Sequence, residues 1–164
     1  MASGTGVGAH LGQNTQQTKG TLPVAVDGAR TPDRIPDDVA YWLFLTGMAL
    51  PPESSADRLG AREAMLTRAG LSGEDRAAFV DGLEGLRQGL DEVSRLRNQF
   101  GPNSQLSPDA RTKYLTLKAR ETELVVEARS RVERLLSSDG RTRLDAFIRT
   151  HVKTRVKIFG EAVQ

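Results

Sequence analysis

Large apolar residues recur at helical spacing through the middle of the chain. One set, in alternating steps of four and three residues, predicts a helix over about residues 72–100: Phe79, Leu83, Leu86, Leu90, Val93, Leu96 and Phe100. A second set predicts a helix over about residues 107–135: Tyr114, Leu117, Leu124, Ala128, Val132 and Leu135. Glu121 interrupts the second stripe and faces either solvent or a basic residue of the other helix. Because only a short turn joins them, the two helices are expected to pair antiparallel.

Three helix starts carry the same short motif, L-S-x-[DE]-x-R. It occurs at residues 71–76, 106–111 and 136–141. In each copy the serine can cap free backbone N–H groups, the acid lies in the first turn, and the leucine anchors the start of the helix. The motif therefore predicts helices that begin near residues 72, 107 and 137.

These helix starts resemble the repeated Leu-Thr-x-x-Gln starts of the small all-helical periplasmic chaperones of the Spy and CpxP type. Residues 71–72 and 106–107 match the first half of that motif, with Ser in place of Thr. The glutamine of the family is replaced in all three copies, by Asp75, Ala110 and Gly140. The resemblance covers residues 71–150 and implies a chaperone or stress-adaptor role.

The first part of the chain has a different character. Residues 1–33 are rich in Gly, Thr, Gln and Asn and predict a disordered tail. Within it, residues 22–26 have the pattern of an extended segment or a weak strand. From Pro36, a proline followed by two acids predicts a helix to about residue 49. A further helix is expected over residues 55–69.

Together these patterns predict an all-α fold. Its expected parts are a disordered tail at residues 1–33 and a single helical domain at residues 34–164. The domain would contain a short apolar helix, a long antiparallel helical hairpin and a basic C-terminal helix.

The short apolar helix carries aromatic residues on several sides. Tyr41, Trp42 and Phe44 are candidate partner-binding residues, because a helix that is apolar all round must be buried on all sides or docked into a partner. The competing interpretation is that the long helices wrap this segment and that its aromatic rings fill the core.

The C-terminal segment HVKTRVKIF, residues 151–159, alternates basic or polar residues with apolar ones. As a helix it extends the stripe of Leu144 and Ile148. As a strand it would need an edge to pair with, either residues 22–26 or a partner chain. The pattern leaves both alternatives open over residues 152–158. The candidate anion-binding residues are Arg149, His151, Lys153, Arg155 and Lys157.

Composition narrows the possible chemistry. The formal net charge is only +2, so a nucleic-acid footprint would have to be local. The chain has no cysteine and only two histidines, far apart in sequence, and it lacks metal-ligand spacing. No arrangement of nucleophile, base and orienting residue is recognisable. We therefore expect no enzyme activity, no cofactor, no metal site and no small-molecule ligand.

The remaining expectation is a non-enzymatic helical module that binds a protein partner or self-associates, in a chaperone-like or adaptor role. The alternative is binding to nucleic acid or acidic lipid through the basic C-terminal segment. No apolar run reaches the roughly 20 residues of a membrane span. The compartment is open: cytoplasmic if residue 1 is the true start, and periplasmic or secreted if the chain is a mature form.

Overall fold

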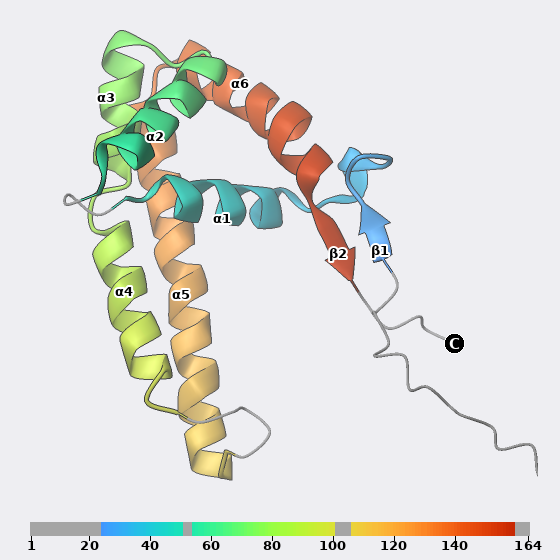
Figure 1. Ribbon diagram of the computed structural model, residues 1–164, viewed down its shortest axis with the longest axis vertical. Coiled ribbons are helices and arrows are strands. Elements are labelled where there is room, and N and C mark those ends of the chain that lie inside the picture. The colour runs from blue at the N-terminus through green and yellow to red at the C-terminus, as the bar shows by residue number, and fades with distance from the viewer. Residues whose placement is uncertain (1–23, 51–53, 101–105, 160–164) are drawn as a thin grey trace, which may run out of the picture.

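The computed structural model describes residues 24–50, 54–100 and 106–159 (Figure 1). Its helices are α1 (Asp37–Met48), α2 (Ala56–Arg68), α3 (Gly73–Gly82), α4 (Leu86–Arg97), α5 (Pro108–Leu135) and α6 (Ser138–Phe147). The shorter elements are the strands β1 (Val24–Asp27) and β2 (Lys157–Phe159), the 3-10 turns η1 (Pro32–Arg34) and η4 (Lys153–Arg155), and the π-helical turn η3 (Ile148–Val152). The all-α class predicted from the sequence is confirmed.

The predicted antiparallel hairpin is present and forms the long arm of the molecule. Helices α4 and α5 lie side by side, and α3 packs against the other end of α5 (Figure 1). Glu121, the residue that interrupts the apolar stripe of α5, accepts a hydrogen bond from Arg97 across the seam at 2.7 Å. Glu121 therefore faces a basic residue of the other helix rather than solvent, which is one of the two alternatives left open by the sequence.

The first arm of the hairpin is not one continuous helix, so that part of the prediction is wrong. Helix α3 ends at Gly82, and α4 begins only after Gly85, whose φ of 80° lies in the left-handed region. Each glycine lowers helix stability by about 1 kcal/mol relative to alanine. Close packing adds a second reason, because a Cβ on Gly82 would lie 2.9 Å from the Cα of Val132. The apolar stripe continues across the break, which is why its period did not reveal it.

Helix α1 crosses α5 and forms the centre of the core (Figure 1). The ring of Phe44 lies between those of Phe79 and Phe147, with ring centroids 5.8 Å apart in both pairs. Tilted aromatic packing of this kind adds to the free energy gained from burial. The core joins elements from both halves of the chain, and its most deeply buried side chains include Ile35, Leu45, Leu66, Leu71, Phe79, Val132, Leu144 and Ile148.

The two strands pair with each other and bring the two ends of the described chain together. β1 runs antiparallel to β2, with Val24 opposite Phe159 and Asp27 opposite Lys157. The sequence offered residues 22–26 as a possible edge for a C-terminal strand, and β1 at Val24–Asp27 overlaps that segment. The predicted tail boundary at residue 33 is wrong, because residues 24–33 form β1, a turn and part of η1. The disorder predicted for the rest of the tail falls on residues 1–23, outside the described residues.

The three predicted helix starts are confirmed at α3, α5 and α6. The hydroxyls of Ser107 and Ser137 accept the backbone N–H groups of Ala110 and Gly140, as an N-cap serine should. Ser72 also stands at an N-cap, without a side-chain hydrogen bond to its own helix. The acid of that first motif, Asp75, caps another helix instead, because its carboxylate accepts both the N–H and the hydroxyl of Ser137.

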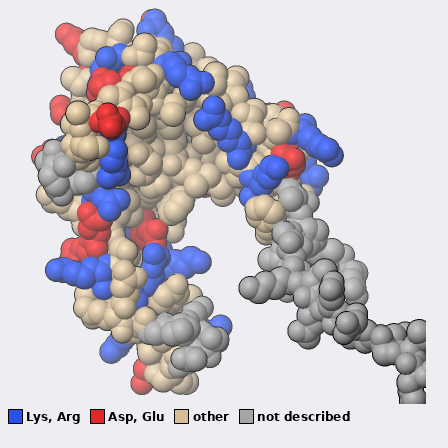
Figure 2. All heavy atoms as spheres, in the orientation of Figure 1, with Lys and Arg blue, Asp and Glu red and all other residues tan. Residues whose placement is uncertain are grey.

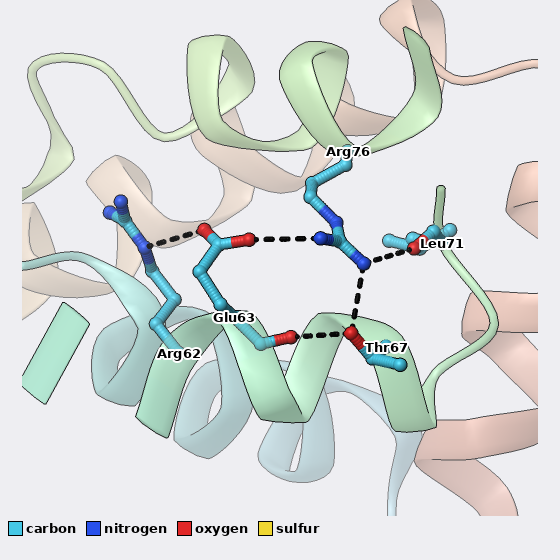
Figure 3. A network of polar contacts seen from close by, with 5 residues as sticks. All are labelled: Arg62, Glu63, Thr67, Leu71 and Arg76. Atoms are coloured by element: carbon cyan, nitrogen blue, oxygen red, sulfur yellow. Dashed lines mark hydrogen bonds and ion pairs between the residues drawn. The ribbon is translucent and has the colours of Figure 1, made fainter. Parts of the chain in front are cut away.

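The arginine of the first motif fastens α2 to α3. Arg76 donates to the carboxylate of Glu63, the hydroxyl of Thr67 and the carbonyl oxygen of Leu71 (Figure 3). Glu63 also faces Arg62 at 4.0 Å. Because Arg76 uses three partners from α2 and the loop after it, this network fixes the angle at which the two short helices meet.

Candidate functional site

An apolar groove opens where α1, α2 and the C-terminal segment meet, with a volume of about 300 Å³. Leu43 and Gly47 of α1 are exposed beside it, and the buried Phe44 and Met48 lie at its base. Leu43 is 42% exposed; a single exposed leucine is ordinary on a protein surface, and this one is informative because it adjoins the other apolar residues of the groove. We call this surface the basic-rimmed groove; it is lined by Leu43, Phe44, Gly47, Met48, Met65, Arg68, Phe147, His151, Val152, Arg155 and Val156.

One wall of the groove is the π-helical turn η3. The N–H of Lys153 donates to the carbonyl oxygen of Ile148, five residues earlier, where an α-helix would use a spacing of four. The wider turn shifts the helical phase, so that the next buried residue after Ile148 is Lys153. His151 is left exposed, with its ring stacked on Phe147 at 4.7 Å between centroids. Turns of this type are frequent at functional sites.

An ion pair between a buried lysine and an exposed aspartate holds this wall against α1. Lys153 is 6% exposed, and its Nζ lies 2.5 Å from the carboxylate of Asp37 in the first turn of α1. The hydrogen bond from Lys153 lowers the pKa of Asp37 below its ordinary value. The backbone is fixed as well, because the N–H of Gly28 donates to the carbonyl oxygen of Val156. A Cβ on Gly28 would collide with the carbonyl oxygen of Lys153, so only glycine allows this approach.

The rim of the groove is basic. Arg68 from the last turn of α2, His151 from η3 and Arg155 from η4 are exposed and line it. No Asp or Glu is among the described residues that line the groove. Among the described residues, no acid forms an ion pair with Arg68 or Arg155. The groove thus combines an apolar floor with two cationic side chains and an imidazole.

The aromatic residues proposed for partner binding serve mainly the core. Tyr41 is buried, so it offers no partner surface, and the prediction for this residue is wrong. Phe44 is buried between Phe79 and Phe147, and it reaches the groove only at its base. Trp42 is half-buried and lines a separate shallow pocket beside α4.

The hydroxyl of Tyr41 belongs to a polar cluster rather than to a binding surface. It donates a hydrogen bond to the carboxylate of Asp145, and the guanidinium of Arg129 lies 4.0 Å from the centre of its ring. Burial, and then the bond to Asp145, raise the pKa of Tyr41 well above its ordinary value. Arg129 is in turn paired with Asp38 and Glu133, both at 2.8 Å. These contacts join α1, α5 and α6 and account for the cluster structurally.

The five residues proposed for anion binding do not form one surface. Lys153 is wrongly assigned, because its ammonium group is occupied by Asp37 and shielded from water. Arg149, His151, Arg155 and Lys157 are exposed, and two of them, His151 and Arg155, lie on the groove. Basic and acidic side chains are mixed over α4 and α5 on the face shown in Figure 2, so that face of the hairpin does not have a single sign of charge.

Apart from Phe44, sequence reasoning missed the residues that α1 and α2 contribute to the groove. Leu43, Gly47 and Met65 belong to ordinary helical patterns, and nothing in the sequence indicates that the two helices leave a gap between them. One signal was present: Gly47 stands inside an apolar helix, where glycine costs about 1 kcal/mol relative to alanine. A Cβ at this position would meet no atom within 4 Å, so tight packing within the protein does not explain this glycine.

The described residues contain no group of three or more His, Cys, Asp or Glu side chains placed to hold a metal ion. No described helix combines the length and apolar character that a membrane crossing requires. Comparison with protein-family models, curated proteins and solved structures finds no match to this chain. The groove is therefore interpreted from its own geometry and chemistry.

Proposed function

We propose that this protein is a non-enzymatic interaction module that binds an apolar segment of a partner protein in the basic-rimmed groove. The observation that carries the proposal is an apolar floor left open to solvent between α1 and α2, with Leu43 exposed beside it. Exposed apolar surface with a polar rim is typical of protein-binding sites.

The dimensions of the groove favour side chains of a protein over a free small molecule. Pockets for small ligands span about 300–1,000 Å³ and enclose most of the ligand. The groove has a volume of about 300 Å³ and is open to solvent, which suits a few apolar side chains. Met48 and Met65 contribute flexible side chains that can adapt to different shapes.

The residues around the groove support binding rather than catalysis. Among the described lining residues there is no carboxylate, hydroxyl or thiol. His151 is the only candidate base among the described residues that line the groove, and its ring is stacked on Phe147 with Nδ1 2.7 Å from the hydroxyl of Thr150. An acyl-transfer or hydrolytic mechanism needs a nucleophile and an orienting group together with the base.

A glycine substitution tests the proposal without damaging the fold. Gly47→Gln would place a side chain over the floor of the groove, and a Cβ there meets nothing within 4 Å. Gly60→Gln is the matched control, because Gly60 is also exposed on a helix with open space at its Cβ, away from the groove. Gly60→Gln lies inside α2 and should gain up to about 0.5–1 kcal/mol of stability from helix propensity, and Gly47→Gln, next to the last residue of α1, should gain less.

The binding assay uses peptides selected from a displayed library against the intact protein. We expect Gly47→Gln to weaken binding at least about tenfold, equal to about 1.4 kcal/mol, and Gly60→Gln to leave it unchanged. Chemical shifts in the NMR spectrum should move at residues of α1, α2 and η3. Equal binding by both variants, or shifts confined to another surface, would reject the groove as the binding site.

A chaperone role is the more specific form of this proposal. It is supported by the resemblance of the helix starts to the Spy and CpxP type and by the exposed apolar floor. The protein should then reduce light scattering by an aggregating client, and Gly47→Gln should lose this effect while Gly60→Gln keeps it. If the wild-type protein leaves scattering unchanged, the chaperone role fails while binding of one specific partner remains testable.

Binding to an anionic surface is the second candidate function. It is favoured by the exposure of Arg149, His151, Arg155 and Lys157 within a short segment. The expected result is steeply salt-dependent binding to DNA or to vesicles of phosphatidylserine, reduced by the triple substitution of Arg149, Arg155 and Lys157 to Gln. Lys153→Met should leave it unchanged, since that ammonium group is already paired. Absence of binding at low salt would remove this candidate.

A further inference from the structure

We propose that the segment bound in the basic-rimmed groove is an amphipathic helix with acidic residues beside its apolar anchors. This inference rests on the proposed function and adds the chemistry of the partner to it. The side chains that would recognise the acidic residues are Arg68 and Arg155.

The first argument is charge. Arg68 and Arg155 stand on the rim of an apolar groove that has no acid among its described lining residues. Some exposed arginines of the hairpin, such as Arg95, Arg111 and Arg134, also form no ion pair with a described acid, but none of them lines this apolar groove. Two arginines beside an apolar surface, without a described acidic partner, match a ligand that brings its own carboxylates.

The ends of the neighbouring helices do not cancel this charge. α1 ends at Met48 and α2 at Arg68, and each C-terminus carries roughly half a negative charge. Together they offset at most about one of the two guanidinium charges. Some of these carbonyl groups are also occupied, because Gly70 and Leu71 donate their N–H groups to Thr67 and Leu66. The rim therefore stays positive through Arg68 and Arg155 alone.

The second argument is the shape of the floor. Leu43 and Gly47 are four residues apart and stand on one side of α1. The absence of a side chain at Gly47 lets another backbone come close beside the exposed Leu43. A partner helix fits such a surface by presenting apolar residues at spacings of three and four, and acidic residues next to them would then face the arginines on the rim.

The experiment compares three peptides with identical apolar anchors and helical propensity, flanked by Glu, Gln or Lys. Their affinity for the intact protein is measured by fluorescence anisotropy. The Glu peptide should bind about tenfold more tightly than the Gln peptide, since two exposed ion pairs contribute an effect of this size. The Lys peptide should bind most weakly, and added salt should reduce the difference.

Charge reversal on the protein completes the test. The variant Arg68→Glu with Arg155→Glu should reverse the order and prefer the Lys peptide. Arg58→Glu with Arg111→Glu makes the same change in net charge at exposed residues away from the groove, and it should keep the original order. All four side chains are exposed, so both variants should fold, which circular dichroism checks.

The outcomes separate this inference from the function on which it rests. Equal affinity for the three peptides, blocked by Gly47→Gln, overturns the inference and leaves the groove as an apolar binding site. If no peptide binds, the proposed function fails. If phosphatidylserine vesicles bind through Arg68 and Arg155 while the peptides do not, the rim recognises a lipid surface and both proposals fall.

Discussion

The ion pair between Asp37 and Lys153 predicts that removing one partner lowers the stability of the protein more than removing the other. Asp37→Ala removes the exposed partner and leaves an ammonium group that is nearly shielded from water. Lys153→Met removes the buried partner, keeps most of the packing of its stem, and leaves a carboxylate whose side chain is already 69% exposed. We therefore expect the substitution of the more exposed residue to be the more damaging one.

The size of the effect follows from the burial of each group. Breaking a fully buried ion pair costs about 3–5 kcal/mol, because a charge remains without compensation. Water reaches this pair from the side of Asp37, so we expect Asp37→Ala to cost about 2 kcal/mol. Lys153→Met should cost less than about 1 kcal/mol, since a well-packed apolar side chain replaces a desolvated charge. In a domain of this size 2 kcal/mol corresponds to a fall of about 4–8 °C in Tm.

Urea denaturation followed by circular dichroism measures these free energies. Asp38→Ala is the matched control: it removes the neighbouring acid from the same helical turn, and its ion-pair partner Arg129 is 29% exposed rather than 8%. We expect this control to cost no more than about 1 kcal/mol. The double variant of Asp37 and Lys153 should resemble Lys153→Met. If Lys153→Met is as damaging as Asp37→Ala, or if Asp37→Ala equals its control, the reasoning about the buried charge is refuted.

Three further predictions concern single contacts. The N–H and the hydroxyl of Ser137 both donate to Asp75 and lower its pKa. The contribution of Asp75 to stability is therefore present above its unfolded pKa of about 3.9, and it is lost as the pH falls through the lower folded pKa. Asp75→Asn should therefore weaken the acid dependence of the free energy of unfolding; an unchanged profile contradicts this. Gly82→Ala should cost at least about 1 kcal/mol, because its Cβ would lie 2.5 Å from the Cγ2 atom of Val132; a gain in thermal stability would contradict the close packing. Tyr41→Phe removes the buried donor to Asp145 and should lower stability by about 1.5 kcal/mol in the same urea assay, and a neutral result would mean that water replaces the bond.

The helices could be predicted because their signals are local. Serine caps, acids in first turns and glycines after last turns lie within a few residues of the boundaries they set. This is why the starts of α3, α5 and α6 and the end of α2 agree with the sequence. The break between α3 and α4 also had local signals, Gly82 and Gly85, but the apolar stripe continues across it and so predicted one helix.

The candidate site could be predicted only in part, because it depends on how distant segments pack. The sequence pointed to residues 151–159, and four of them line the groove: His151, Val152, Arg155 and Val156. It could not identify Lys153 as a buried residue, because a π-helical turn changes the phase of the helix and no periodic pattern anticipates it. Arg68 and Met65 lie far away in sequence, and only the packing of α2 brings them to the groove.

The strand pairing also decides how the molecule would respond to mechanical tension. Val24 and Phe159 face each other in the antiparallel pair, so a force that pulls the two ends of the described chain apart would separate the strands one residue pair at a time. Strands separate at low force when they are unzipped in this way, because the hydrogen bonds break one after another and do not share the force. The turns η4 and η3 follow β2 directly toward the core, so they would be the next to be peeled away. Stretching the protein between its ends would therefore dismantle one wall of the groove while the helical hairpin remained intact.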